Sequence, residues 1–103
     1  MPSASLSNNE VLDELRRLVR RGKIAWTTHA EERLAQRGFD RSQVKDCLLS
    51  GFFTEPPTIP IRSGPIGYKF TMEAHIDGDA IAVAACLYPE KNVVVISVID
   101  VSN

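Results

Sequence analysis

Three side chains that can move a proton or bind a phosphate recur every four residues: His29, Arg33 and Arg37. The segment 28–37 is predicted to be helical, and residues at this spacing lie along one stripe of a helix. In the first helical turn the helix dipole disfavours the imidazolium, which suits His29 to accept a proton. A base and two guanidiniums can cleave RNA without a metal, because the base takes the 2′-hydroxyl proton and the cations stabilise the phosphorane. The alternative is an ordinary solvated helix face with i,i+4 pairing.

A second group of polar side chains alternates with apolar ones from residue 68 to residue 76. This alternation predicts a strand with Lys69, Thr71, Glu73 and His75 on one wet side. Glu73 and His75 are close enough there to act as an acid–base pair. We therefore take Lys69, Glu73 and His75 as candidate substrate-binding residues. The alternative is the polar side that any half-exposed strand presents.

The charge of the chain gives no general attraction to nucleic acid or membrane, because the formal net charge is −1. Five basic residues do cluster within residues 16–23, and this cluster could meet a phosphate backbone. The more ordinary interpretation is the solvated face of a helix. The basic residues of the cluster are Arg16, Arg17, Arg20, Arg21 and Lys23.

Start and stop signals predict three helices in residues 7–51. Each segment begins with a capping pair and ends at a glycine. The pairs are Ser7 with Glu10, Thr28 with Glu31, and Asp40 with Gln43, and the glycines are Gly22, Gly38 and Gly51. Five apolar side chains of these helices are expected to be buried against a sheet: Leu12, Leu15, Leu34, Val44 and Leu48.

The sequence from residue 66 to residue 101 predicts an antiparallel β-meander. Asp77 and Gly78 form a two-residue hairpin turn, which pairs Met72 with Val83. The far side of the pair is then floored by small residues, which leaves a shallow trough beside the polar row. The proline-rich segment after Phe53 is interpreted as a loop with at most one edge strand.

Together these elements predict one α+β domain over residues 1–103. Its three N-terminal helices would pack on one face of a three- to four-stranded antiparallel β-meander. Residues 1–6 would be frayed, residues 7–51 helical, and residues 66–101 the meander.

The two cysteines, Cys47 and Cys86, are expected to be buried free thiols. The sequence shows no metal-ligand spacing and no cofactor motif, so no metal and no cofactor are expected. It also shows no signal peptide and no apolar run long enough to cross a bilayer, so we expect a cytoplasmic protein without a membrane partner.

The stretch from Trp26 to Asp40 resembles the start of a small bacterial family known as domain of unknown function 4258. The resemblance rests on five residues: His29, Ala30, Arg33, Arg37 and Gly38. It implies a RelE-like fold and similarity to RelE-like and MqsR-like toxins. The implied activity is metal-independent cleavage of mRNA by the toxin of a toxin–antitoxin pair, and the implied partners are RNA and an antitoxin protein.

The sequence departs from this family pattern in the second hairpin. Where the family tends to carry an arginine and a histidine, this chain has residues 78–83, Gly-Asp-Ala-Ile-Ala-Val. The alternative function is therefore a non-catalytic protein-binding module on the same fold, either an inactive toxin relative or a homodimer. Its docking surface would be the small-residue face of the sheet or the edge of the last strand.

Overall fold

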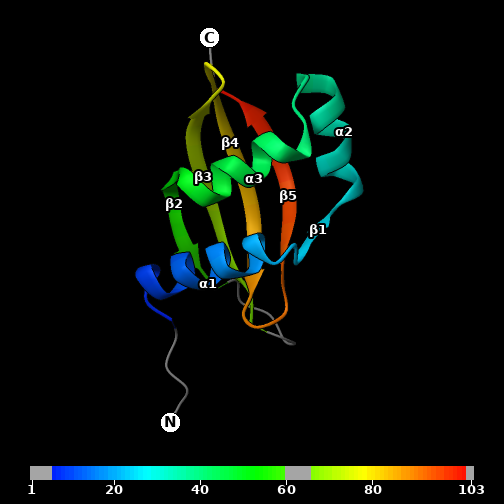
Figure 1. Ribbon diagram of the computed structural model, residues 1–103. Helices are drawn as coiled ribbons and strands as arrows, with labels where there is room; N and C mark the ends of the chain where they lie inside the picture. Colours follow the sequence, from blue (N-terminus) through cyan, green and yellow to red (C-terminus); the bar gives the residue numbers. More distant parts are fainter. Residues whose placement is uncertain (1–5, 60–65, 102–103) are drawn as a thin grey trace.

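The structure is a computed structural model of the 103-residue chain, and it describes residues 6–59 and 66–101 (Figure 1). A single sheet has the strand order β1-β5-β4-β3-β2, in which β1 runs parallel to β5 and all other pairs are antiparallel. The elements are α1 (Asn8–Arg20), β1 (Ile24–Trp26), α2 (Thr28–Arg37), α3 (Arg41–Ser50), β2 (Phe52–Thr58), β3 (Tyr68–Ile76), β4 (Asp79–Tyr88) and β5 (Asn92–Asp100).

The predicted three- to four-stranded antiparallel meander is wrong, because the sheet has five strands and is mixed. One strand outside the predicted meander is β1, which joins the sheet next to β5. Its three residues are too few to show the alternation that marks a strand. Ile24 pairs with Val93 and Trp26 with Val95, almost 70 residues later in the chain, so long-range pairing makes this strand.

The second added strand, β2, contains Pro56 and Pro57, which argued for a loop. Proline is tolerated here because β2 is the outermost strand, where one row of N–H groups has no ladder to join. Its register with β3 shifts twice, between Phe53 and Glu55 and again before Thr58. Two further prolines of the proline-rich segment, Pro60 and Pro65, lie outside the described residues.

The β3–β4 hairpin has the predicted register throughout, with Met72 opposite Val83 and Glu73 opposite Ala82. The turn residues Asp77 and Gly78 have φ angles of 53° and 86°. Both values belong to the left-handed region that a two-residue type I′ turn requires. The turn therefore sets the register, and the register decides which side chains face each side of the sheet.

Two of the three helix starts are as predicted, since Ser7 and Asp40 both form reciprocal capping boxes. The N-cap of α2 is Thr27, one residue before the predicted Thr28. Its side chain accepts a hydrogen bond from the Ala30 backbone N–H. Gly51 ends α3 with an extended φ of −84°. A Cβ at this position would lie 2.5 Å from the Glu73 carbonyl oxygen, so glycine permits the close approach of α3 to β3.

The core lies between one face of the sheet and the helices α1 and α3, which both cross that face in Figure 1. Leu15, Leu34, Val44 and Leu48 are buried as predicted, whereas Leu12 is only partly buried. The helix α2 packs against β5, beside the sheet edge that carries β1. Its buried residues Ala30 and Leu34 belong to the same core as those of α1 and α3.

The opposite side of the sheet, which we call the open face, carries the odd-numbered residues of β3 and the even-numbered residues of β4, with their partners on β2 and β5. Its centre is floored by small side chains, as predicted: Ala80, Ala82 and Cys86 are buried and Ala84 is half-buried.

The start of the described chain is attached to the sheet. Residues 1–5 of the segment predicted to be frayed lie outside the described residues. Leu6, the last residue of that segment, donates its backbone N–H to the Tyr68 hydroxyl over 3.0 Å, and its side chain packs against the core. The prediction of fraying is therefore wrong for Leu6.

Both cysteines are free thiols, as predicted, and they lie on opposite sides of the sheet. Cys47 is fully buried on the inner side of α3, and its Sγ lies 3.6 Å from the Met72 carbonyl oxygen. Burial raises the pKa of the Cys47 thiol to about 12. At neutral pH it therefore has almost no thiolate, which is the reactive form.

We expect Cys47 in the Cys86→Ser variant to react with a thiol reagent only after unfolding, because the thiol is both buried and protonated. Two thiols should titrate in the unfolded wild type without reductant. Equal rates of labelling in the native and unfolded variant, or the absence of titratable thiols, would contradict this expectation.

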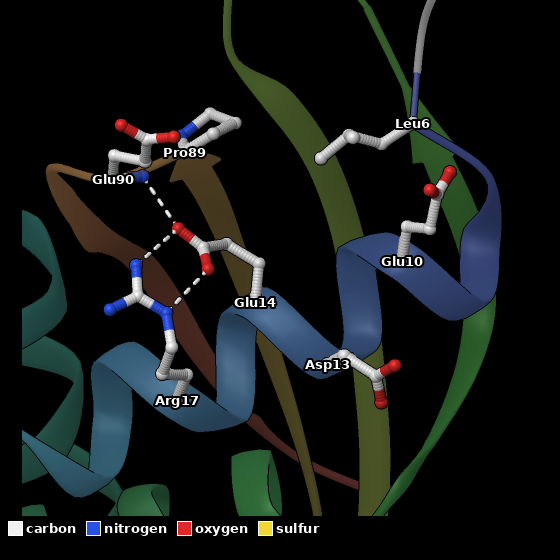
Figure 2. Close-up of a pocket in the computed structure, with 7 residues that line it drawn as sticks. All are labelled: Leu6, Glu10, Asp13, Glu14, Arg17, Pro89 and Glu90. Atoms are coloured by element: carbon white, nitrogen blue, oxygen red, sulfur yellow. Dashed lines mark hydrogen bonds and ion pairs between the residues drawn. The ribbon is translucent and has the colours of Figure 1, made fainter.

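A groove of about 700 Å³ lies between the start of α1 and the β4–β5 turn (Figure 2). At its centre the Glu14 carboxylate accepts hydrogen bonds from the Arg17 guanidinium at 2.7 and 2.8 Å and from the Glu90 backbone N–H at 2.6 Å. Glu90 has a φ of 62°, so Glu14 secures a turn residue in the left-handed region. These hydrogen bonds therefore connect α1 to the β4–β5 turn, which gives the residues in the groove a structural role.

The hydrogen bonds from Arg17 hold the pKa of Glu14 below its usual range, against the opposing effect of partial burial. A carboxylate with a lowered folded-state pKa stabilises the protein above its unfolded-state pKa, and this stabilisation is lost as the pH falls through the folded-state pKa. The unfolding free energies of wild type and Glu14→Gln should therefore converge as urea denaturation is moved from about pH 7 to about pH 3. A difference that is constant over this range would show that the charge of Glu14 does not stabilise the turn.

Candidate functional site

The candidate site is built on α2, which two hydrogen bonds from Thr27 attach to β5. The Thr27 backbone N–H donates to the Val95 carbonyl at 3.2 Å, and its hydroxyl donates to the Ile96 carbonyl at 3.2 Å. Ala30 and Leu34 are buried on the inner side of α2. The stripe that begins with His29 is consequently held outward at a fixed position beside β5.

The His29 ring lies between two polar side chains. Its Nε2 accepts from Arg33 Nε at 3.4 Å and lies 3.4 Å from the hydroxyl of Ser97 on β5. Arg33 also donates from Nη1 to Gln36 Oε1 at 3.0 Å, which fixes the plane of the guanidinium. His29 is exposed and contacts side chains, so it is not a histidine of the core.

This arrangement leaves the His29 nitrogen available to a ligand. Both distances to Nε2 are long for a hydrogen bond, and the two neighbours share a single lone pair. A substrate hydroxyl can therefore displace either neighbour. The planar Arg33 guanidinium beside it can bind two oxygens of a phosphate when its contact to His29 or to Gln36 is exchanged for the phosphate. Arg37 is exposed one helical turn farther along α2.

Sequence reasoning missed Ser97, which lies 68 residues from His29. One signal was present: Ser97 is the single polar side chain within residues 93–99 of an otherwise apolar strand. Its position depends on an irregularity in β5, where Ala84 pairs with Ser97 but Ala85 pairs with Val95. Ile96 is the extra residue, and this β-bulge brings Ser97 to the edge facing α2.

The predicted polar row of β3 lies on the open face. It is separated in space from His29, which is on α2. Lys69 and His75 are exposed, and Glu73 is half-buried. The strand β4 lies between β3 and β5, so the backbones of β3 and β5 are about 10 Å apart. Thr71 is in the same cross-strand row as Ser97, and its hydroxyl donates to Glu55 on β2.

A family model described as "Domain of unknown function (DUF4258)" matches residues 26–100 of the chain. The chain belongs to the DUF4258 family. The match covers both α2, with the His29 stripe, and the strands β3 to β5. Neither a curated protein nor a solved structure matches the chain.

The basic cluster of this DUF4258 protein is partly used within the fold. Arg16 donates from Nη2 to the Gly51 carbonyl at 3.0 Å and from Nε to the Leu48 carbonyl at 3.4 Å, and thereby caps the end of α3. Arg17 pairs with Glu14. These two guanidiniums are therefore already bound, and Arg20, Arg21 and Lys23 are exposed.

The possible metal ligands of this DUF4258 protein are dispersed. Within residues 6–59 and 66–101, no three His, Cys, Asp or Glu side chains gather in a way that could hold a metal ion. Over the same described ranges, no helix is long and apolar enough to span a membrane.

Proposed function

We propose that this DUF4258 protein is a metal-independent endoribonuclease of the toxin type. The observation that carries the proposal is the exposed His29 Nε2 at 3.4 Å from the Arg33 guanidinium. A proton acceptor beside a fixed planar cation is the minimum needed to activate a 2′-hydroxyl and to stabilise the phosphorane that forms.

The residues of the stripe take separate roles in this proposal. His29 takes the proton of the 2′-hydroxyl, whose oxygen attacks the neighbouring phosphorus and forms the cyclic phosphate. The bond from phosphorus to the 5′-oxygen breaks, and the 5′-oxygen takes a proton from water. Arg33 binds the oxygens of the attacked phosphate. Arg37 lies about 6 Å farther along the helix axis and binds the same phosphate or the next one. Lys69, Glu73 and His75 bind the part of the RNA that crosses the open face.

The toxin assignment draws on the resemblance of members of the DUF4258 family to RelE-like and MqsR-like toxins. It implies an antitoxin protein as a second partner beside RNA. A short adjacent reading frame that encodes a zinc-finger or helix-turn-helix protein would support this assignment, whereas an isolated gene would favour a binding protein.

The test is cleavage of a mixed RNA pool by the full chain in the presence of EDTA. We expect fragments that end in a 2′,3′-cyclic phosphate, and no cleavage of a substrate with 2′-deoxy sugars, because the attacking hydroxyl is then missing. Overproduction should slow growth. The absence of cleavage at any enzyme concentration, together with unchanged growth, would refute the proposal.

A second candidate function is a non-catalytic protein-binding module. It is favoured by large apolar side chains exposed on the sheet, of which Phe52 at 59% and Ile99 at 41% share one cross-strand row. The RNA assay separates the two functions, because a pure binding module gives no cleavage.

A further inference from the structure

Three basic side chains gather where the chain passes from α1 into β1. The Val93 backbone N–H donates to the Lys23 carbonyl at 2.9 Å, so Lys23 lies beside the start of β5. Lys91, in the β4–β5 turn, is two residues from this contact, and Arg21 is the C-cap of α1. All three are exposed, and none of them forms an ion pair within the described residues. We call Arg21, Lys23 and Lys91 the β1 basic patch.

The stripes of α1 decide which of its arginines belong to this patch. Arg17 binds Glu14, whose carboxylate also holds the β4–β5 turn. Arg21 comes four residues after Arg17 and therefore lies on the same side of the helix, toward that turn. Arg20 instead follows Arg16, whose guanidinium binds carbonyls at the end of α3. Arg21 therefore belongs to the patch, and Arg20 lies on the side of α1 that faces α3.

The strand β1 leads from the patch to the candidate site, along the outside of the sheet (Figure 1). Lys23 precedes the strand, and Thr27, which attaches α2 to β5, follows it. Four residues of extended chain place Lys23 about 13 Å from Thr27. The patch and the pair of His29 and Arg33 are therefore at the two ends of one sheet edge, close enough for a single RNA strand of a few nucleotides to contact both.

The outer edge of β1 presents free backbone groups between these two ends. In a parallel ladder, alternate residues turn their N–H and C=O groups toward the same neighbour. The Lys23 carbonyl and the Thr27 N–H are bonded to β5, so the groups of Ile24 and Trp26 point away from the sheet. Within the described residues, no hydrogen bond engages these outward groups. Each residue thus offers a donor beside an acceptor, which an unpaired base can bond along its edge.

The charge along this edge favours an anion, although the whole chain has a net charge of −1. Two carboxylates near the edge, Glu14 and Glu31, are each bound by an arginine. The exposed carboxylates of Glu32 and Glu90 remain. Against them stand the cations of the patch and of the α2 stripe, which are Arg21, Lys23, Lys91, Arg33 and Arg37.

We propose that the β1 edge binds a single-stranded segment of the RNA, and that the β1 basic patch holds its phosphates a few nucleotides from the bond that is cut. The inference rests on the proposed function, which supplies RNA as the ligand and the other phosphate contact at Arg33. The RNA on the other side of the cut bond then crosses the open face. The substrate class is therefore unpaired RNA, because a duplex has no free base edges to offer to Ile24 and Trp26.

The test measures RNA binding separately from cleavage. The full chain with His29→Ala is titrated into a fluorescein-labelled single-stranded RNA of about 12 nucleotides, and anisotropy is followed at several salt concentrations. Adding Arg21→Gln, Lys23→Gln and Lys91→Gln together should weaken binding at low salt by at least about tenfold. The slope of log Kd against log salt should fall by about 2, since each phosphate contact to a single strand contributes about 0.7. An unlabelled duplex of the same sequence should compete less well than the unlabelled single strand.

The matched control is Lys45→Gln, which removes one charge at an exposed position of α3, away from the β1 edge. It should leave the salt slope unchanged, whereas Lys23→Gln alone should lower the slope by about 0.7. Circular dichroism should show that all variants are folded. Equal effects of Lys45→Gln and Lys23→Gln would show a general effect of net charge and overturn the inference.

Two further outcomes separate this inference from the proposed cleavage. An unchanged salt slope in the triple variant would overturn the inference even if the wild type cleaves RNA. Binding that depends on the patch, without cleavage by the wild type, would support the inference and refute the cleavage. A polyglutamate peptide that competes as well as RNA of equal charge would identify the edge as a site for an acidic protein segment, and would also overturn the inference.

Discussion

His29→Ala should lower the rate of RNA cleavage by about 10²–10⁴-fold, which is the usual contribution of a general acid or base. The same substitution should change the free energy of unfolding by no more than about 0.5 kcal/mol, because the ring is exposed and its two contacts are long. Activity lost with stability retained distinguishes a catalytic group from a structural one. The measurements are single-turnover cleavage with EDTA present and urea unfolding of both proteins. If His29→Ala instead unfolds the protein at lower urea and keeps its activity, the catalytic role of His29 is excluded.

Arg33→Lys serves as the companion variant because it keeps the charge and removes the planar fork. The wild-type guanidinium is oriented by Gln36 and by His29, and an ammonium group cannot reproduce this two-sided arrangement. We expect a loss of at least about tenfold in cleavage. Arg20→Lys, at an exposed position of α1, is the matched control and should retain full activity.

The parts of the structure that follow local rules could be predicted from the sequence. The Asp77-Gly78 turn fixes the β3–β4 register, and the capping boxes of Ser7 and Asp40 fix two helix starts. The His29 stripe was predictable for the same reason, because residues four apart on one helix are neighbours wherever that helix lies.

The features that the sequence did not reveal depend on contacts between distant segments. The strand β1 exists through its pairing with β5, and three residues carry no periodicity of their own. Ser97 reaches His29 because of a bulge in β5 that no local pattern announces. The open face could be predicted from the alternation of β3 and β4. Its exposed apolar side chains Phe52 and Ile99 required the positions of β2 and β5.

Leu15→Ala should destabilise the protein by about 2–5 kcal/mol, which is the largest stability effect that we expect from one substitution. Leu15 is fully buried on the inner side of α1, which packs against α3 and β5. Removing its isobutyl group loses the transfer free energy of the side chain and leaves a cavity. The sheet on one side and α3 on the other are held by their own hydrogen bonds, so they close that cavity only in part.

The matched control is Leu12→Ala, the same chemical change one turn earlier on α1. Leu12 is partly buried and packs at the margin of the core, so its truncation removes less apolar contact and opens the site to water rather than leaving a void. In urea the midpoint of Leu15→Ala should fall well below that of Leu12→Ala, with equal m-values for both. Because a small domain has only about 5–15 kcal/mol of stability in total, Leu15→Ala should also be partly unfolded on mild heating. Equal midpoints for the two variants would mean that the packing of α1 against the sheet does not depend on the side chain of Leu15.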